Sequence, residues 1–523
     1  MQHPERLTGW RFAVFNLSLG LGHLIVLLNA GAYIAMLPRV AGGLGIPPSL
    51  GTWTQTDYMV GLALAFPLAS WLSSRIGDYR LFSIAFVVFA LASVLIAVSR
   101  DLHAFLGARI LLGLAGGITL PLGQSLILKE YPEEKKSLGL AVWSVFTLSP
   151  FTLGTSIGGW IADCPGWRWL FYLNVPVSLC VAASVAALLY GRDTNVSPRR
   201  LDWVGYLLLV LVLGGTQTFL NQGNDWDWLA SPSLVWVGAT VLVALAYLIV
   251  WEWDTPQPLI DLRLFTQRNF TIGFIGLFGG FLIFQGMLSL LVVQLQLLMG
   301  YPSFLAGLVF LPMAVFAKPL AAVMHEAVKR IDARALASLN LLAFAFTYFY
   351  IGTFDHTDDF EQILWPKLVE GFCLGSFFVP LTAIMLDGLP AERHVRAIEF
   401  ANLMRITAGS FGITLQGVML YRRTPFHQSR FVEHLTAFDR ITNETVQRFA
   451  ARGFSQEAAI ATLAKLTTRH AALLAINDAF WIAGWAFLAL SLLVWAARPT
   501  VVRRRKSIHE LRRESLEELI EEP

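Results

Sequence analysis

The chain alternates long apolar runs with short polar or Gly/Pro-rich segments along almost its whole length. A helix that crosses a bilayer needs about 20 consecutive, mostly apolar residues. Fourteen runs meet this requirement, so the pattern predicts fourteen transmembrane helices. Their approximate centres are Val26, Leu62, Phe89, Gly116, Phe151, Val181, Leu211, Val241, Phe284, Val315, Ala343, Gly375, Ala408 and Trp485.

Basic residues gather in the short segments that follow the even-numbered runs. The intervening short segments hold few lysines or arginines, and two of them, "GNDWDW" and "DHTDDFE", are acidic. Because Lys and Arg favour cytoplasmic loops, this bias predicts that both termini lie on the cytoplasmic side. The basic residues include Arg75, Arg80, Lys129, Arg192, Arg263, Arg268, Lys329, Arg330, Arg393 and Arg396.

One segment between the last two runs, residues 422–473, is polar throughout and contains helix-like stretches such as "SQEAAIATLAKL". We expect a small extracytoplasmic subdomain there, and a simple spacer is the alternative. In the tail, residues 499–523, charges pair at helical spacing in "SIHELRRESLEELIEE". This predicts a solvated or membrane-surface helix after the last run.

Two pairs of segments repeat weakly. The stretch "PLASWLSSRIGDYR" (67–80) is echoed by "PLAAVMHEAVKRIDAR" (319–334), and "RILLGLAGG" (109–117) by "KLVEGFCLG" (367–375). Transporters are often built from such internal repeats. The sequence therefore predicts an all-α integral membrane protein with an N-terminal six-helix half (1–195), two inserted helices (196–262), a C-terminal six-helix half (263–498) and a tail (499–523).

Composition agrees with a membrane protein. Hydrophobic residues make up 55% of the 523 residues, charged residues 14%, and the mean hydropathy is +0.59, which leaves too little polar surface for a soluble globule of this size. The first run is long enough to span, so we expect a retained anchor and not a signal peptide. The net charge of +3 forms no basic patch, so no nucleic-acid partner is expected.

Several reaction classes are disfavoured by missing motifs. The 3 cysteines lack metal or redox spacing, which argues against a metal site or a disulfide framework. No G-x-x-x-x-G-K-[ST] loop is present, which argues against an ATP-driven pump. No His or Asp cluster has metal-ligand or nucleophile spacing, so we expect neither an enzyme nor a cofactor.

At several motifs the chain resembles the major facilitator superfamily, and most closely its fourteen-span, EmrB-type drug:proton antiporters. The segment "SWLSSRIGDYR" is similar to the loop motif G-x-L-x-D-R-x-G-R, with Ser70 and Ser74 in place of its first glycine and its acid. The segment "RILLG" is similar to R-x-x-Q-G, with Leu112 replacing the glutamine. The run "PFTLGTSIGGWIADCPGWRWLFYLNVP" is similar to the fifth-span antiporter motif, with Thr155 where proline is usual. The likeness covers essentially the whole chain and implies the major facilitator fold.

The first motif points to a gate between the second and third runs. Gly77 permits a tight turn there, and Arg75 and Arg80 can bond the exposed carbonyls of a nearby helix end. Asp78 is expected to stand in for the acid that Ser74 lacks. Plain positive-inside charge is the alternative for the arginines.

The fifth run places three glycines on one helical stripe, where a helix of the other half can approach closely and rock. Simple packing glycines are the alternative. The three are Gly154, Gly158 and Gly159.

Ionisable groups inside spans cost about 2.5–3.5 kcal/mol at a helix centre, so they mark transport pathways by default. Arg109, Lys318, Glu370 and Arg405 meet this criterion. A structural ion pair is the alternative for Lys318 and Glu370, whereas the R-x-x-Q-G resemblance implies that Arg109 lies beside the proton path. The predicted polar and aromatic lining of a central cavity comprises Asn29, Tyr33, Phe284, Gln285, Gln294, Arg405 and Asn477.

The first run, "VLLNAGAYIAMLP", carries Asn29 where related exporters usually have an aspartate. Asn29 cannot titrate, so we expect it to bind substrate through hydrogen bonds. Glu370 lies inside the twelfth run, where the EmrB-type pattern has a neutral glutamine, and it is the predicted proton carrier. Asp478, at the outer end of the last run, is the reserve candidate.

The predicted function is export of drugs or other amphipathic compounds by alternating access, driven by proton entry across a bacterial inner membrane. The resemblance implies a periplasmic adaptor of the EmrA type and an outer-membrane channel of the TolC type, with residues 422–473 as the expected adaptor contact. Two alternatives remain open: a dedicated exporter of one metabolite, such as an organic acid or a siderophore, and a non-transporting membrane sensor.

Overall fold

The computed structural model describes residues 7–132, 153–192, 200–256, 258–355, 360–436 and 438–500, and in these ranges every regular element is a helix. The longer helices are α1 (Gly9–Leu44), α2 (Pro48–Ile76), α3 (Asp78–Val98), α4 (Leu102–Glu130), a helix over 153–163, α6 (Arg168–Leu188), α7 (Trp203–Gln222), α8 (Pro232–Asp254), α9 (Arg268–Val293), α10 (Ser303–Leu308), α11 (Leu311–Ala327), α12 (Ala333–Ile351), α13 (Phe360–Leu386), α14 (Ala391–His434), α15 (Arg440–Ala451) and α16 (Gln456–Val494). Three single turns join them: η2 (Trp228–Ala230), η3 (Leu262–Thr266) and the π-helical η4 (Gln294–Leu298).

Twelve helices of the described residues are long and apolar enough to cross a membrane. They contain twelve of the predicted centres. The tenth predicted run is divided, since α10 ends at Leu308 and α11 begins at Leu311, directly before Pro312. The centre of the fifth run, Phe151, and the tail from residue 501 lie outside the described residues. The prediction of an all-α membrane protein is confirmed.

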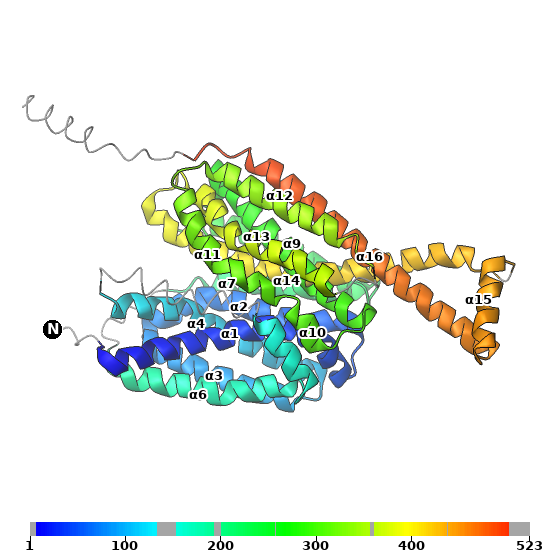
Figure 1. Ribbon diagram of the computed structural model, residues 1–523. Coiled ribbons are helices and arrows are strands. Elements are labelled where there is room, and N and C mark those ends of the chain that lie inside the picture. The colour runs from blue at the N-terminus through cyan, green and yellow to red at the C-terminus, as the bar shows by residue number, and fades with distance from the viewer. Residues whose placement is uncertain are drawn as a thin grey trace, which may run out of the picture.

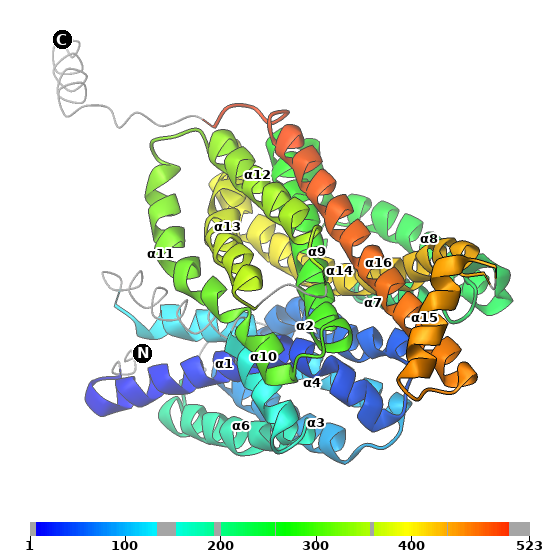
Figure 2. The ribbon, with the colours of Figure 1, turned by 45° about the vertical axis from the view of Figure 1, so that its right-hand side comes forward.

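The helices form two halves, which Figures 1 and 2 show as a blue to cyan body and a green to red body. Phenylalanines such as Phe82, Phe86 and Phe105 fill the core of the N-terminal half. Others, such as Phe344 and Phe487, fill the core of the C-terminal half. Both described ends of the chain lie at one end of the bundle, which we call the terminal end (Figure 1).

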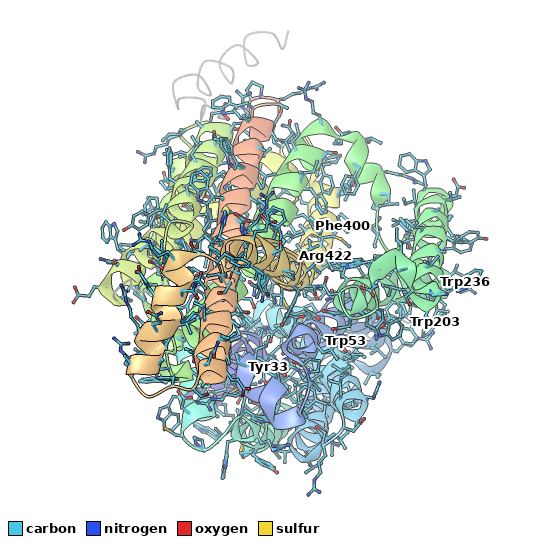
Figure 3. All side chains as sticks on the ribbon, turned by 90° about the vertical axis from the view of Figure 1, so that its right-hand side faces the viewer. Tyr33, Trp53, Trp203, Trp236, Phe400 and Arg422 are labelled. Carbon is cyan, nitrogen blue, oxygen red and sulfur yellow. The ribbon has the colours of Figure 1, made fainter. Side chains whose placement is uncertain are left out.

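Two inserted helices, α7 and α8, lie beside the seam between the halves. Helix α7 packs against α2 and α14, one helix from each half. Helix α8 packs on α7 and turns large apolar side chains outward, including Trp236, which is 74% exposed (Figure 3). Because α8 is also long and apolar enough to cross a membrane, this outward apolar face is suited to contact lipid.

Residues 422–473 form an arm that continues the membrane helices. Helix α14 runs on to His434, α15 crosses at the tip, and α16 begins at Gln456. The arm projects from the end of the bundle opposite the termini, which we call the arm end (Figure 1). The described part of the segment, for which the sequence predicted a small extracytoplasmic subdomain, consists of extensions of the last two membrane helices joined by α15.

Glycines allow the helix over 153–163 to touch its neighbours backbone to backbone. A Cβ at Gly154 would lie 2.9 Å from the backbone nitrogen of Ala32, and one at Gly158 would overlap Ala32 directly. A Cβ at Gly159 would overlap the Ser303 carbonyl at the start of α10. The glycine stripe therefore contacts α1 on one side and the C-terminal half on the other.

We expect Gly159→Ala to lower the free energy of unfolding by roughly 1–3 kcal/mol, because the added methyl group meets rigid backbone. Gly107→Ala is the matched control, since a Cβ at that helical position would meet no atom within 4 Å. Thermal unfolding of the two purified variants checks the difference. Equal stability would show that the contact with Ser303 does not require glycine.

Candidate functional site

Arg109 forms the centre of a buried cluster in the N-terminal half. Its guanidinium carbon lies 4.0 Å from the centre of the Tyr33 ring and 4.6 Å from that of Tyr58. Its Nε donates a 3.0 Å hydrogen bond to the Thr54 carbonyl, while the two terminal nitrogens have no hydrogen-bond partner in the described structure. Stacking on ring faces stabilises a cation that is removed from water.

Asp57 is a buried acid that the sequence reasoning missed. It lies inside α2, next to Tyr58, and interacts electrostatically with Arg109. The criterion that selected Glu370, an ionisable residue within an apolar run, would also have found Asp57. Asp57 and Arg109 together place an acid and a base inside the N-terminal half.

Asn29 lies close to this cluster but turns toward other helices. Its side-chain amide exchanges two 3.1 Å hydrogen bonds with that of Asn174 on α6, and Asn174 also donates to Ser93 on α3. A further 2.8 Å bond runs from the Asn29 amide to the Ile25 carbonyl. The hydrogen-bonding capacity of Asn29 is therefore used mainly within the N-terminal half.

Arg405 lies on α14 against α9 and α13. Its guanidinium carbon is 5.6 Å from the Phe281 ring centre and 5.2 Å from that of Phe378. Gln285 lies one turn beyond Phe281 and is fully buried, and neither its amide nitrogen nor its oxygen has a hydrogen-bond partner in the described structure. Unsatisfied buried polar groups of this kind call for a ligand or a structural explanation.

Two other predicted lining residues of α9 and η4 occupy different surroundings. Phe284 packs its ring 6.0 Å from Phe344 in the core of the C-terminal half. Gln294 begins η4 at the arm end, where it is buried and its amide atoms find no partner among the described residues.

Glu370 forms an ion pair within its own helix. Lys367 lies 2.6 Å from Glu370 Oε2, and each side chain is 1% exposed. The Lys367 ammonium also faces the Phe310 ring at 5.1 Å. Lys318, the other basic residue expected nearby, belongs to α11, but its side chain lies outside the described part of the structure.

Asp478 and Asn477 lie where α14 and α16 leave the bundle to form the arm. Asp478 accepts a 2.5 Å hydrogen bond from Arg423 and a 2.7 Å bond from His427. Asn477 donates a 3.0 Å hydrogen bond to the Phe354 carbonyl. Asp478 thus clamps the base of the arm and is separate from Glu370.

The predicted gate at the α2–α3 turn forms its contacts within the N-terminal half. Gly77 has φ +94°, a conformation that suits glycine best. Asp78 accepts hydrogen bonds from Ser73, from Ser125 at 2.7 Å and from Lys129 at 2.6 Å. The arginines contact aromatic rings: Arg75 lies 4.9 Å from the Trp71 ring and Arg80 5.7 Å from that of Tyr79.

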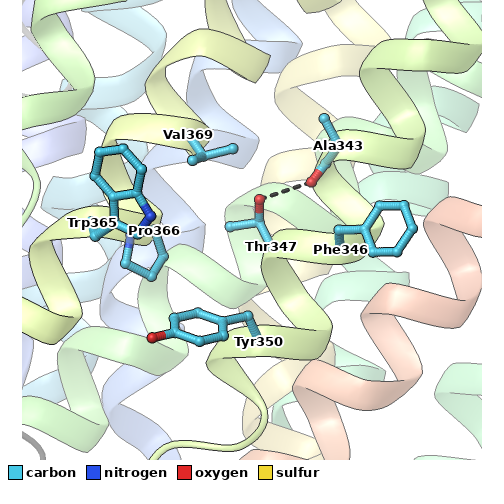
Figure 4. A pocket seen from close by; sticks show the side chains of 7 residues that line it. All are labelled: Ala343, Phe346, Thr347, Tyr350, Trp365, Pro366 and Val369. Atoms are coloured by element: carbon cyan, nitrogen blue, oxygen red, sulfur yellow. Dashed lines mark hydrogen bonds between the residues drawn. The ribbon is translucent and has the colours of Figure 1, made fainter.

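A pocket of about 470 Å³ lies between α12 and α13, and none of the residues described so far lines it. Figure 4 shows its aromatic rim, in which Phe346 and Trp365 are 71% and 64% exposed. The Thr347 hydroxyl donates a 2.8 Å hydrogen bond to the Ala343 carbonyl. The pocket is thus a shallow apolar depression, lined by Ala343, Phe346, Thr347, Tyr350, Trp365, Pro366 and Val369.

The structure therefore divides the predicted site residues into separate clusters. Tyr33 joins Arg109, while on the other half Gln285 lies one turn along α9 from Phe281, whose ring Arg405 faces. Asn29, Glu370 and Asp478 each have a different partner. The Arg109 and Arg405 clusters lie on different halves of the bundle.

Comparison with known proteins gives one consistent picture. Residues 19–413 match the family model described as Major Facilitator Superfamily. The chain is 33% identical over 500 residues to the multidrug export protein EmrB of Escherichia coli K12, covering 95% of this chain and 98% of the relative. It is 33% identical over 499 residues to the fatty acid resistance protein FarB of Neisseria gonorrhoeae, with the same coverage.

Solved structures share the fold. A bacterial homologue of the human lysosomal transporter Spinster, in an inward-facing and occupied conformation, aligns with a TM-score of 0.59 at 14% identity, covering 94% of this chain and 99% of that one. The peptide transporter POT in complex with sulfate aligns with a TM-score of 0.58 at 14% identity, covering 92% and 95%. At this identity the likeness concerns the fold alone.

We expect the Asn29–Asn174 pair to couple α1 to α6 energetically. Asn29→Ala and Asn174→Ala should each destabilise the protein, and the double variant should lose about 0.6 kcal/mol less than the sum, as for other interhelical hydrogen bonds in membranes. Unfolding equilibria of the four proteins in the double-mutant cycle measure this coupling. Strictly additive losses would mean that the two amides do not stabilise each other.

Proposed function

This chain belongs to the major facilitator superfamily, and we propose that it is a proton-coupled exporter of drugs and other amphipathic compounds. It is a membrane transporter and not an enzyme, as its family and its transporter relatives show. The observation that carries the proposal is the similarity to EmrB over 95% of the chain, which includes the predicted motif regions.

Alternating access is supported by where the halves touch. Ser156 donates a 3.0 Å hydrogen bond to the Gly307 carbonyl, and Gln296 donates one of 2.8 Å to the Ala35 carbonyl. On the other side of the seam, Ser410 donates to the Thr56 carbonyl at 3.2 Å. These contacts lie toward the arm end. A switch would break them and bring the halves together at the terminal end.

Proton coupling is assigned to buried acids, because Asn29 cannot titrate. Glu370 remains our proposed carrier, and the pair of Asp57 and Arg109 offers a second acid inside the membrane. Arg109 favours the ionised form of a neighbouring carboxylate, so a change in its distance would change the proton affinity of that carboxylate. Asp478 is less suited to the role, because two basic groups hold it at the base of the arm.

The proposed location is a bacterial inner membrane, with both termini cytoplasmic and the arm in the periplasm. An EmrA-type adaptor and a TolC-type channel would complete the export path. The arm presents apolar side chains to solvent, including Phe438 at 99% and Ile441 at 66% exposure. Solvent-exposed apolar side chains on a projecting element are typical of a protein-binding surface.

A dedicated exporter of an organic acid is the second candidate. The relative named for fatty acid resistance covers the chain as completely as EmrB does. A fatty acid is both amphipathic and a carboxylic acid, so this candidate differs from the first in breadth and not in mechanism.

The direct test uses the purified full chain in liposomes with a panel of amphipathic dyes and fatty acids. An imposed gradient, acidic inside, should drive uptake of several chemically different compounds, and nigericin in potassium buffer should abolish it. Uptake that continues after the gradient collapses would contradict proton coupling. Uptake of a single compound would favour the dedicated exporter.

We expect Glu370→Gln alone to destabilise the protein by roughly 3–5 kcal/mol, because it leaves Lys367 buried without its partner. The double variant Lys367→Met/Glu370→Gln removes both charges and should recover most of that stability. If Glu370 carries the proton, the folded double variant binds substrate but does not respond to the pH gradient. Normal proton-driven transport by the double variant would make the pair structural, and Asp57→Asn would then be the variant to measure.

We expect the arm to be needed for resistance but not for transport. Gln428 and Thr468 are joined by a 3.1 Å hydrogen bond across the arm, so a four-residue Gly-Ser linker can replace residues 430–466 and keep the clamp at Asp478. Cells with this variant should lose resistance, while uptake into liposomes should stay within about twofold of the full chain. Loss of liposome uptake as well would place the arm within the transporter's own fold.

A further inference from the structure

Arg405 is a positive charge inside a membrane helix of the C-terminal half. Its side chain is half-buried. Its Nε is buried and has no hydrogen-bond partner in the described structure. Resting on the proposed export function, we propose that Arg405 and Gln285 form an anion-recognition site that binds the carboxylate or phenolate head of an amphiphilic substrate.

Two other cations of the described structure form ion pairs with acids. Lys367 pairs with Glu370 at 2.6 Å, and Arg192 with Glu130 at 2.7 Å. Arg405 forms no ion pair within the described residues, and its guanidinium faces the rings of Phe281 and Phe378. A positive charge inside an apolar membrane helix costs free energy when no opposite charge lies nearby. A bound anionic ligand would supply the opposite charge for Arg405.

The face of α14 that carries Arg405 also meets the other half. Gly409 lies four residues after Arg405 and so on the same face. A Cβ at Gly409 would lie 2.9 Å from Met59 of α2 and 3.3 Å from Gln285 of α9. Arg405 therefore lies one turn from a point where both halves and the unpartnered amide converge.

The chemistry of these side chains matches an anionic amphiphile. A guanidinium is planar and can donate two parallel hydrogen bonds to a carboxylate. The Gln285 amide can donate to the same group, and Phe281 and Phe378 offer apolar surface to the rest of the molecule. A cationic head would be repelled by Arg405, so the site also discriminates by charge.

The test uses three fluorescent probes with one skeleton: 4-(1-pyrenyl)butanoate, its primary amide and the corresponding amine. Binding is measured on the full chain in nanodiscs of phosphatidylcholine, without a pH gradient and without anionic lipid that would compete.

The wild type should bind the carboxylate at least tenfold more tightly than the amide, and the amine most weakly. Arg405→Gln should reduce the carboxylate affinity to that of the amide, with amide binding unchanged within twofold, and Arg405→Lys should retain part of the preference. Arg396→Gln is the matched control, because Arg396 is exposed on the same helix.

Equal affinity of the wild type for all three probes would overturn the proposal, and this result does not depend on any variant. An equal loss of all three probes in folded Arg405→Gln protein would also overturn it. A carboxylate preference that depends on Arg405 would support the site even if proton-driven transport failed. The failure of the export function and the failure of the anion site are therefore separate results.

Discussion

A helix bundle in lipid must satisfy its polar side chains from within, because the bilayer core offers no hydrogen-bonding water. This requirement joins the two halves. Gln217 of α7 donates a 2.5 Å hydrogen bond to Thr414 of α14, and Asn221 of the same helix donates one of 3.1 Å to Thr56 of α2. The resulting polar seam comprises Thr52, Thr56, Gln217, Asn221, Ser410 and Thr414. Helix α7, which the sequence predicted as an insertion between two six-helix halves, therefore also links these halves to each other.

A second type of contact complements this seam on the opposite side. There the glycines of 153–163 and Gly307 of α10 bring main chains together without side chains between them. Hydrogen bonds and small-residue packing are both weak per contact in a membrane, which suits a joint that must open. Both sets of contacts lie toward the arm end of the bundle.

Charges inside the bundle fall into two groups with different consequences. Lys367 and Glu370 neutralise one another, so either a proton or a substrate must compete with an existing partner. Arg109 and Arg405 are held largely by aromatic rings, which stabilise a cation without cancelling its charge. Arg109 and Arg405 lie on different halves, and neither forms an ion pair within the described residues.

The sequence by itself determined the helical class, the positions of the membrane helices and the two-half division suggested by its repeats, because hydrophobic runs and turn residues are local properties. Gly77 and the glycines near 158 could be recognised for the same reason, since short sequence motifs indicate where a tight turn or a close helix contact needs glycine. Which helix each polar side chain faces was decided only by the tertiary structure. Asn29 turned toward Asn174, which lies 145 residues away in the sequence, and residues 422–473 became continuations of α14 and α16. Asp57 could be recognised in the sequence as an acid within a membrane helix. Its proximity to Arg109 depends on how α2 is rotated about its axis where it packs on α4, and no local sequence pattern determines that rotation.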